Sequence, residues 1–367
     1  MKILETPAYF LPHIGGIESV VYSLSKEWIK LKHKVKIITS SIGSDKTKEI
    51  MEDIKVGRIK SFTFIQDAIA PLLPFSLHSA DIAHIHHPHP YWMFVCASYF
   101  RIKKVPYVVH MHGKEIVYTG WKKWIAIFYN YFFLDFILRR SEKIISHTIK
   151  VIPQSQYLRK YKNKIVCIPH GTDLMHFKKI KRSNFIFSVG IRDYKRLDIL
   201  IRSMPLILKK VKTRLVIAGK GKEKDKLEKL IEKLGLQEEV IFLGYITEGQ
   251  KYGLYQKAGV FILPSPTIME SFGTVAFEAL SMKCPTIVTS GAGISEIFEK
   301  EKIGIIVQPY KITELAEQIV KLLKNKKLAN EIGEKGYKVI EKKYQWKHIA
   351  KKYIEIFEEV IKNARAN

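Results

Sequence analysis

Apolar residues recur along the first half of the chain in two alternating patterns. Short runs rich in valine and isoleucine predict strands at 1–6, 34–40, 81–86, 107–112, 143–148 and 164–171. Between the first two runs, residues 17–31 repeat apolar side chains at helical spacing, which predicts a helix with one buried face. Strands that alternate with helices predict a parallel sheet covered by helices on both faces.

The same alternation restarts after a polar, basic link at 178–183. Strands are expected at 185–190, 213–221, 240–246, 260–265, 285–290 and 304–309, and helices at 197–211, 226–235 and 251–258. Two α/β halves of roughly 180 residues are therefore expected, with boundaries at 1–178 and 183–345. Because doubly wound sheets bind ligands outside the carboxyl ends of their strands, a cleft between two such domains is the expected site.

Composition narrows the class of protein. Apolar residues make up 47% of the 367 positions and charged residues 26%, as in a folded globular protein. The three cysteines lie far apart, which favours a reducing compartment over a disulfide framework or a zinc ribbon. The N-terminal segment lacks the apolar core of a signal peptide. The most apolar run, 124–138, is too short and too polar to cross a bilayer, so a cytoplasmic location is expected.

The charge is strongly positive and unevenly distributed. The formal net charge is +27, and residues 101–164 hold 14 Lys and Arg against 3 Asp and Glu, a net of +11. Eight aromatic residues lie between Trp121 and Phe136 in the same segment. Basic residues beside an aromatic-rich helix favour an anionic surface at the inner face of the cell membrane, or an anionic lipid acceptor. A core helix with solvated lysines around it is the alternative. Nucleic acid is less favoured, because the aromatic residues cluster in one apolar helix.

The segment MESFGTVAFEAL, residues 269–280, carries the most distinctive polar pattern. It follows the predicted strand at 260–265 and leads into a helix that is expected to begin near Gly273. The first N–H groups of a helix are unpaired and its dipole favours an anion there, while a glycine lets a ligand approach the backbone closely. Glu270 then precedes the helix, and Glu278 lies about a turn and a half inside it.

The spacing of the two glutamates limits what they can do together. Eight residues of helix span roughly 12 Å, whereas the paired carboxylates of glycosidases sit about 5–9 Å apart. Glu270 and Glu278 are therefore expected to serve two ends of a long ligand whose anionic middle rests on the helix start. The structural alternative is that Glu270 caps the helix and Glu278 forms a buried ion pair.

Two further loops are candidates for phosphate contacts. Three cations, Arg192, Lys195 and Arg196, follow the predicted strand at 185–190, where they are well placed for phosphate oxygens. A loop with two adjacent glycines, Gly15 and Gly16, follows the first strand, but it matches neither the dinucleotide nor the Walker pattern. An ATPase or a dinucleotide-binding protein is therefore less favoured.

Histidines gather around two predicted strands of the first half. They are His84, His86, His87, His89, His110 and His112. His110 and His112 alternate on one strand, so their side chains are expected on the same side, toward the cleft. No carboxylate or cysteine stands at ligand spacing beside them in the sequence, and no Asp-x-Asp pair occurs in the chain. Polar contacts to a ligand are therefore favoured over a metal site.

Six motifs, in order along nearly the whole chain, resemble those of the group 1 retaining glycosyltransferases of family 4, which have the GT-B fold. They are GGIESVVYSLSKEW, VVHMHG, VCIPHGTDLMHF, SVGIRDYKRLDILI, ESFGTVAFEAL with its E-x7-E spacing, and YQWKHIAKKY. The resemblance implies an α/β chain of two Rossmann-like, doubly wound domains facing across a cleft. The N-terminal domain would bind the acceptor and be completed by the C-terminal helix 346–367, and residues 183–345 would bind the donor.

The resemblance also implies roles for individual residues. Glu270 and His112 would lie at the reacting sugar as the catalytic residues. The donor contacts would be Gly16, Arg192, Lys195, Ile246, Ser271, Phe272, Gly273, Thr274 and Glu278. Lys195 and Arg192 would neutralise the diphosphate, Glu278 would hold the ribose hydroxyls, and Ile246 would lie near the base. No metal ligand and no cofactor is implied. Two positions depart from the family pattern, because Ile191 replaces a usual arginine and Arg196 a usual glycine.

The expected function is transfer of a hexose-type sugar, with retention of configuration, from a UDP- or GDP-sugar. The expected acceptor is a lipid-linked or cell-envelope glycan at the cytoplasmic face of the membrane. The charge that develops on the leaving diphosphate would be stabilised by the helix start and the lysine, without a metal. A soluble enzyme for a small acceptor such as a sugar phosphate is the alternative, and a nucleic-acid-binding protein is a less favoured one.

Overall fold

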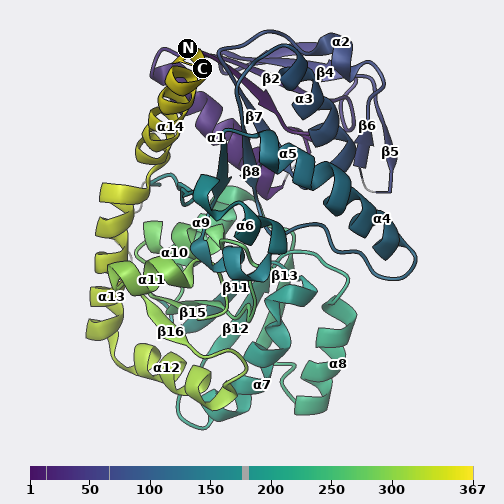
Figure 1. Cartoon of the computed structure of the whole chain (residues 1–367). Helices are drawn as coiled ribbons and strands as arrows, with labels where there is room; N and C mark the ends of the chain where they lie inside the picture. The colour runs from purple at the N-terminus through teal and green to yellow at the C-terminus, as the bar shows by residue number, and fades with distance from the viewer. Residues whose placement is uncertain (14, 66, 176–181, 367) are drawn as a thin grey trace. The chain divides into compact units, whose positions relative to one another are not determined.

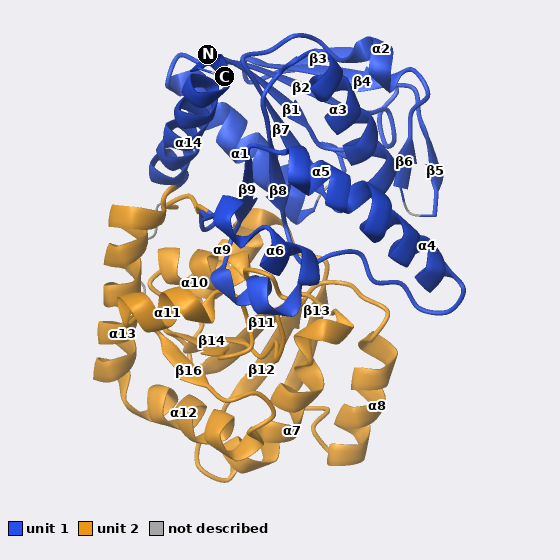
Figure 2. Ribbon diagram, in the orientation of Figure 1, with its two compact units in different colours: residues 1–170, 346–367 blue, residues 171–345 orange. Residues whose placement is uncertain are grey.

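We describe the protein from a computed structural model of the chain, which describes residues 1–13, 15–65, 67–175 and 182–366 (Figure 1). The chain divides into two compact units. Unit 1 comprises residues 1–170 and 346–367, and unit 2 comprises residues 171–345 (Figure 2). Most of the link expected at 178–183, and the domain end expected at residue 178, lie outside the described residues.

Unit 1 is built on an eight-stranded sheet in the order β10-β9-β8-β7-β1-β2-β4-β3. Its strands are β1 (Lys2–Thr6), β2 (Lys34–Ser40), β3 (Lys48–Met51), β4 (Ile54–Ile59), β7 (Ile82–His87), β8 (Tyr107–Met111), β9 (Lys143–Ser146) and β10 (Ile165–Cys167). All neighbours pair in parallel except β3 and β4. The strand order reverses beside β1, because the chain goes out to β2 on one side and returns to β7 on the other. Ligands of doubly wound sheets bind at such a reversal.

The described residues of unit 1 form seven α-helices, and the first of them corresponds to the helix expected at 17–31. They are α1 (Gly16–Lys30), α2 (Leu73–Ser76), α3 (Pro90–Ile102), α4 (Lys122–Phe128), α5 (Asp135–Arg140), α6 (Gln156–Lys160) and α14 (Trp346–Ala366). A π-helical segment, η1 (Tyr129–Leu134), joins α4 to α5. Trp28 of α1 is fully buried, donates a hydrogen bond to the carbonyl of Ala350 at 3.1 Å and packs against Phe357. The last helix of the chain is therefore part of the core of unit 1.

Residues 41–80 form more strand than the sequence pattern indicated. No strand was expected at β3 or β4, nor at the small hairpin of β5 (Phe62–Phe64) and β6 (Asp67–Ile69). The sequence of β4, IKVGRI, alternates in burial, but lysine, glycine and arginine are not typical strand residues. Pairing with β2 along five register positions supplies the stability that the local sequence does not.

Unit 2 is built on a six-stranded, fully parallel sheet in the order β13-β12-β11-β14-β15-β16. The strands are β11 (Phe185–Val189), β12 (Arg214–Ala218), β13 (Val240–Gly244), β14 (Val260–Leu263), β15 (Thr286–Thr289) and β16 (Ile305–Val307). The helices are α7 (Leu197–Leu208), α8 (Lys224–Leu234), α9 (Glu248–Lys257), α10 (Thr274–Ser281), α11 (Ser295–Glu301), α12 (Ile312–Lys324) and α13 (Lys326–Val339).

The strand order of unit 2 is that of a Rossmann fold, with the reversal between β11 and β14. The prediction of two doubly wound, parallel α/β sheets is confirmed. Because β11 and β14 are hydrogen-bonded neighbours, the loops that leave their carboxyl ends start from the same edge of the sheet. These two loops carry the cations at 192–196 and the segment 269–280, and this brings their side chains together.

Candidate active site

The loop after β14 ends at a glycine, Gly273, directly before α10. Gly273 has a φ of 90°, in the left-handed region. A Cβ there would lie 2.7 Å from Cδ2 of Leu263, so a side chain does not fit without movement. α10 begins at Thr274, and no described side chain caps its N-terminus. Its first backbone N–H groups are therefore available to an anion.

Glu270, in the loop after β14, forms an ion pair with Lys195, in the turn after β11. The strand order of the unit 2 sheet reverses between these two strands. The two side chains are 13% and 8% exposed, and Nζ of Lys195 lies 3.3 Å from Oε2 of Glu270. The same ammonium donates to the carbonyl of Val189 at 3.2 Å, and the hydroxyl of Ser265 is 3.5 Å from Oε2. The structure thus shows Glu270 in an ion pair and not as the cap of α10. A largely buried ammonium stands where an anion on the helix start would need a counter-charge.

The arginines of this turn do not join the pair. Arg196 has a φ of 49°, which explains why glycine is typical at this place. Its guanidinium donates to Asp198 at 2.8 Å and lies over the ring of Tyr310. Arg192 is exposed and lines a pocket of about 320 Å³ that also contains Arg196 and Asp198. Within the described part of the chain, no hydrogen bond or ion pair connects Arg192 to Glu270.

Glu278 is held by two residues of α9 that sequence reasoning missed. Nζ of Lys251 lies 3.0 Å from Oε2, and the hydroxyl of Tyr255 donates to the same oxygen at 3.0 Å. Burial raises the pKa of Tyr255, and the neighbouring carboxylate of Glu278 raises it further. The ion pair considered as the structural alternative is therefore present. However, Oε1 has no hydrogen-bond partner among the described residues, so one oxygen can still accept from a ligand hydroxyl.

The remaining residues assigned in unit 2 lie in or beside the same loops. Phe272 is buried and packs edge-on against Phe277, which fixes the backbone between Ser271 and Thr274. Ile246 is half-buried in the turn between β13 and α9. The loop after β15 was not recognised in the sequence, yet the N–H of Gly293 donates to the carbonyl of Glu270 at 3.1 Å and so supports that residue.

Gly16, in unit 1, is the first residue of α1. Apart from its chain neighbours and the backbone of its own helix, no described atom lies within 4 Å of the position that its Cβ would take. The preceding Gly15 is crowded by the carboxylate of Glu18, which is 3.0 Å from Nδ1 of His13. Packing within the described residues therefore explains a glycine at position 15 but not at position 16.

Histidines of β7 and β8 converge with a buried glutamate of β1. Glu5 and His84 are register partners on neighbouring strands. The carboxylate of Glu5 accepts hydrogen bonds from His84 at 2.8 Å and from His86 at 2.5 Å. Nδ1 of His86 then lies 3.0 Å from Nε2 of His112. In the sequence no carboxylate stands beside these histidines, but the sheet supplies one from a position 79 residues earlier. A chain of hydrogen bonds therefore connects Glu5 to His112.

Burial disfavours the charged form of three histidines of this cluster. It lowers the pKa of His86 to about 4, and it lowers the pKa values of His110 and His112 well below the ordinary range. Burial alone would raise the pKa of Glu5, but the positive charge that His84 and His86 carry when protonated, together with their hydrogen bonds, outweighs burial and brings that pKa to about 2. His110 and His112 stack with ring centroids 3.9 Å apart, so they lie on the same side as expected.

Two overlapping groups of three histidines have nitrogen atoms within 4.8 Å of one another. They are His84, His86 and His110, and His110, His112 and His147. Both nitrogens of His86 already have hydrogen-bond partners, one on Glu5 and one on His112. Nitrogen donors of this kind suit zinc, copper or nickel rather than magnesium. The cluster is therefore not the oxygen-rich site that would hold a divalent ion on a diphosphate.

Two family models together span most of the chain. Residues 14–176 match the model of glycosyltransferase family 4, and residues 173–339 match the model of glycosyl transferases group 1. The chain is a group 1, family 4 glycosyltransferase. The resemblance seen in the six motifs is thereby confirmed. The enzyme is a retaining glycosyltransferase that uses a nucleotide-sugar donor.

Curated relatives of this glycosyltransferase match it from end to end. An uncharacterised glycosyltransferase of Methanocaldococcus jannaschii is 27% identical, covering 97% of this chain and 98% of its own. The O-antigen chain mannosyltransferase C of Escherichia coli is 24% identical, with coverage of 97% and 98%. The N-acetyl-alpha-D-glucosaminyl L-malate synthase of Bacillus anthracis is 23% identical, with coverage of 96% of both chains.

Solved structures confirm the GT-B fold of the enzyme. The sucrose-phosphate synthase of Thermosynechococcus elongatus aligns with a TM-score of 0.78 at 18% identity, over 99% of both chains. A protein of Anabaena solved in complex with UDP and glucose aligns with a TM-score of 0.74 at 16% identity, over 98% of this chain and 100% of its own. At these identities the likeness shows the fold alone.

The helix expected at 124–138 in this glycosyltransferase is only partly a core helix. Phe133 packs on Phe94 of α3 with centroids 4.6 Å apart, and Asn130 donates to the carbonyl of Ile116 at 2.8 Å. The other side of this helical segment, together with the residue at its N-terminal end, exposes large apolar side chains. They are Trp121, Trp124, Ile125, Ile127, Phe128, Tyr131 and Phe132. We call these seven residues the aromatic surface. Trp124 is 72% exposed, which is unusual for so large an apolar side chain. No described helix is both long enough and apolar enough to cross a membrane.

Proposed function

We propose that this glycosyltransferase moves a hexose-type sugar from a UDP- or GDP-sugar to a lipid-linked or cell-envelope glycan acceptor. The donor part of this proposal is supported by the ion pair of Lys195 with Glu270, which lies beside the uncapped start of α10. A diphosphate on this helix start meets backbone N–H groups and one ammonium, which stabilise the charge that develops as it leaves. The acceptor's proton passes to the leaving phosphate during attack on the same face of the sugar.

Other residues contact the two ends of the donor, which are the sugar and the nucleoside. Glu270 contacts the sugar, with Ser271 to Thr274 around it. Glu278 accepts from the ribose through its Oε1, which has no hydrogen-bond partner among the described residues. Ile246 lies toward the base, and Arg192 reaches the diphosphate by a rearrangement of its exposed side chain. From unit 1, Gly16 brings its backbone N–H to the phosphate and His112 contacts the sugar. The hydrogen bonds from Glu5 through His86 orient the ring of His112.

We also propose that the transfer needs no metal and no cofactor. Backbone N–H groups and the ammonium of Lys195 already supply positive charge where a diphosphate would lie. No Asp-x-Asp pair is present in the sequence to hold a divalent ion. Activity is therefore expected to survive EDTA.

The donor proposal is tested with UDP-, GDP- and ADP-sugars, each with glucose, mannose or N-acetylglucosamine. Wild-type enzyme is expected to show an increased melting temperature and slow donor hydrolysis with one base, in the presence of EDTA. If none of these donors raises the melting temperature or is hydrolysed, the assignment of the donor site is wrong.

A matched pair of glycine variants separates ligand contact from folding. Gly16→Ala is expected to fold like the wild type, because nothing described lies near its Cβ, but to raise KM for the donor about tenfold by blocking the approach of the phosphate. Gly273→Ala is expected to lower the melting temperature, because its φ of 90° and Leu263 both oppose a side chain. Thermal unfolding and donor hydrolysis measure the two effects. Unchanged donor kinetics in Gly16→Ala would remove Gly16 from the site.

The aromatic surface supports a membrane-bound acceptor at the cytoplasmic face. Trp121, Trp124 and Phe128 are more than half exposed and stand beside Lys122 and Lys123. Amphipathic helices with aromatic side chains and lysines bind the headgroup region of anionic membranes. A relative named as an O-antigen chain mannosyltransferase is consistent with a glycan acceptor.

A double variant tests this surface directly. Trp124→Ala with Phe128→Ala is expected to reduce co-sedimentation with phosphatidylglycerol vesicles at least tenfold, because both side chains would otherwise insert into the interface. A control with Phe62→Ala and Phe64→Ala removes two exposed aromatic side chains from the β5 hairpin, outside the aromatic surface. Equal vesicle binding by all three proteins would remove the aromatic surface from the membrane contact. No vesicle binding by the wild type would instead favour a soluble enzyme for a small acceptor, as the name of the malate synthase relative suggests.

A further inference from the structure

Five lysines share one face of the sheet in unit 1. They are Lys2 of β1, Lys34 and Lys36 of β2, Lys48 of β3 and Lys55 of β4. Lys2 pairs in register with Lys34, and Lys36 pairs with Lys55. Lys48 pairs with Gly57, two residues beyond Lys55. Register partners and residues two apart project from the same side of a sheet, so all five side chains do. We call this set the lysine face.

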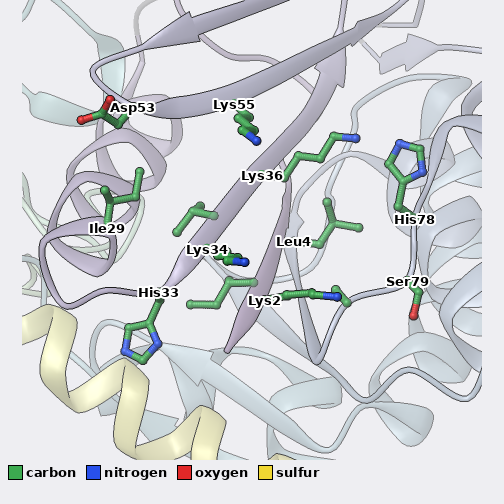
Figure 3. A pocket seen from close by; sticks show the side chains of 13 residues that line it. Lys2, Leu4, Ile29, His33, Lys34, Lys36, Asp53, Lys55, His78 and Ser79 are labelled. Carbon is green, nitrogen blue, oxygen red and sulfur yellow. The ribbon is translucent and has the colours of Figure 1, made fainter.

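The lysine face lines two adjoining pockets. The first has a volume of about 390 Å³ and contains Lys2, Lys34, Lys36 and Lys55, together with His78. Figure 3 shows these lysine side chains gathered over the same strands, with Lys36 extending toward His78. The only carboxylate that lines it is Asp53, among the residues that the structure describes. The second pocket, of about 840 Å³, shares Lys36, Lys55 and His78 and adds Lys48 with the exposed apolar side chains of Ile50 and Phe75.

These cations repel one another in the absence of a ligand. Like charges opposite each other on neighbouring strands are destabilising. Burial lowers the pKa of Lys36, and the nearby charges of Lys48 and Lys55 lower it further. None of the five lysines forms an ion pair within the described chain, and the carboxylate of Glu49 in the second pocket is already bound to Arg58. An anion would remove this repulsion.

Protection of the sheet edge does not explain the arrangement. Lysines on an edge strand prevent pairing with another chain. Lys48 on the edge strand β3 fits that role, and so does Lys55 on the adjacent strand β4. However, β1 and β2 are interior strands, with a paired neighbour on each side. Lys2 and Lys34 are the first residues of those strands, so they lie at the opposite end of the sheet from Gly16 and His112. The lysine face is therefore separate from the proposed active site.

The spacing of the cations indicates the shape of the ligand. Lys34 and Lys36 are two residues apart on one strand, which is roughly 6.6 Å, and the strands lie about 4.8 Å apart. Lysine side chains that start from backbone positions at this spacing can reach two neighbouring anionic groups of one ligand. Lysine binds phosphate oxygens as a point charge and does not require a planar partner.

We propose that the lysine face binds a ligand that carries two or more phosphate groups. The phosphates occupy the first pocket between the pairs Lys2–Lys34 and Lys36–Lys55. Such a group could come from a soluble diphosphate or from a lipid with a diphosphate headgroup. In the second case, the chain of the lipid lies in the adjoining pocket against Ile50 and Phe75.

Calorimetry with inorganic pyrophosphate and with geranyl diphosphate, a charge-matched lipid diphosphate, tests the proposal. The wild type is expected to bind one of them at a single saturable site. Lys36→Gln with Lys55→Gln is expected to weaken binding at least tenfold and, without ligand, to raise the melting temperature. A control with Lys229→Gln and Lys326→Gln removes two exposed lysines of unit 2 and should bind like the wild type.

The two ligands distinguish the sources. Tighter binding of geranyl diphosphate, lost in Phe75→Ala, assigns a lipid headgroup, whereas equal binding of both assigns a soluble diphosphate. The proposal is overturned if the pocket variant and the control lose binding equally, because attraction to the overall positive charge would then explain the result. It is also overturned if the pocket variant binds like the wild type.

Discussion

Replacing Lys195 by methionine is expected to lower kcat for donor hydrolysis by about 10²–10³-fold, with a smaller effect on KM. Its ammonium lies 3.3 Å from Glu270 and next to the start of α10, where a leaving diphosphate would gain charge in the transition state. An interaction that strengthens as charge develops acts on kcat and not on ground-state binding. Initial rates at saturating and limiting nucleotide-sugar measure the two constants separately.

Stability measurements separate this catalytic effect from damage to the fold. Lys195→Met leaves the mostly buried carboxylate of Glu270 without its ion pair, which is expected to cost about 1–3 kcal/mol of unfolding free energy. Adding Glu270→Gln should restore much of that stability while activity stays low. Lys226→Met, an exposed lysine on α8, serves as the control. Full activity in Lys195→Met would contradict the donor site as proposed.

The pairing of Lys195 with Glu270 shows how far the sequence could predict the site. Apolar spacing and glycines indicated that both residues follow strands, and the six motifs indicated a donor site. The distance between the two residues depends on β11 and β14 being neighbours, and strand order is decided by the packing of the whole sheet. Local sequence does not encode that order. The ion pair was therefore visible only in the structure.

Glu5 illustrates a second limit. A glutamate in the apolar strand MKILET gave no functional signal, because its partners His84 and His86 lie on β7. Lys251 and Tyr255 around Glu278 were missed for a similar reason, since α9 meets α10 only in three dimensions. Patterns with a period of 2 or 3.6 residues show which face of an element is buried, but not what it is buried against.

Residues 41–80 were missed for a different reason. The strand β4 pairs with β2 through a sequence that contains lysine, glycine and arginine, so propensity and burial disagree. Two lysines of this segment, Lys48 and Lys55, belong to the lysine face. A segment that breaks the usual preferences of a buried parallel sheet is more often functional than an ordinary one. The mismatch between the low strand propensity of β4 and its observed pairing therefore indicates the lysine face, which the charge repulsion also indicates.

Acidification from pH 7 to pH 4 is expected to unfold unit 1. Unfolding should occur at a higher pH than in a protein without buried histidines. Burial lowers the pKa values of His86 to about 4, and of His87 and His147 to about 3, from 6.5. As the pH falls below 6.5, the unfolded chain binds these protons and the folded one does not, so stability is lost down to the folded pKa values. Each histidine contributes about 1.4 kcal/mol per pH unit over this interval. Glu5, with a pKa of about 2, adds to the loss only below about pH 4.5.

Urea unfolding at pH 7.5, 6.5, 5.5 and 4.5, followed by the fluorescence of the buried Trp28 and Trp92, measures this slope. His87 offers a matched variant, because its Nε2 has no hydrogen-bond partner among the described residues and it has no proposed role in transfer. His87→Gln removes one titrating group, so the slope is expected to fall by about 1.4 kcal/mol per pH unit while stability at pH 7.5 changes little. A stability that is flat between pH 6.5 and 4.5 would mean that these histidines are already protonated in the folded state. The buried carboxylate of Glu5 would then be neutralised by a histidinium, and its hydrogen bond to His86 would be that of an ion pair.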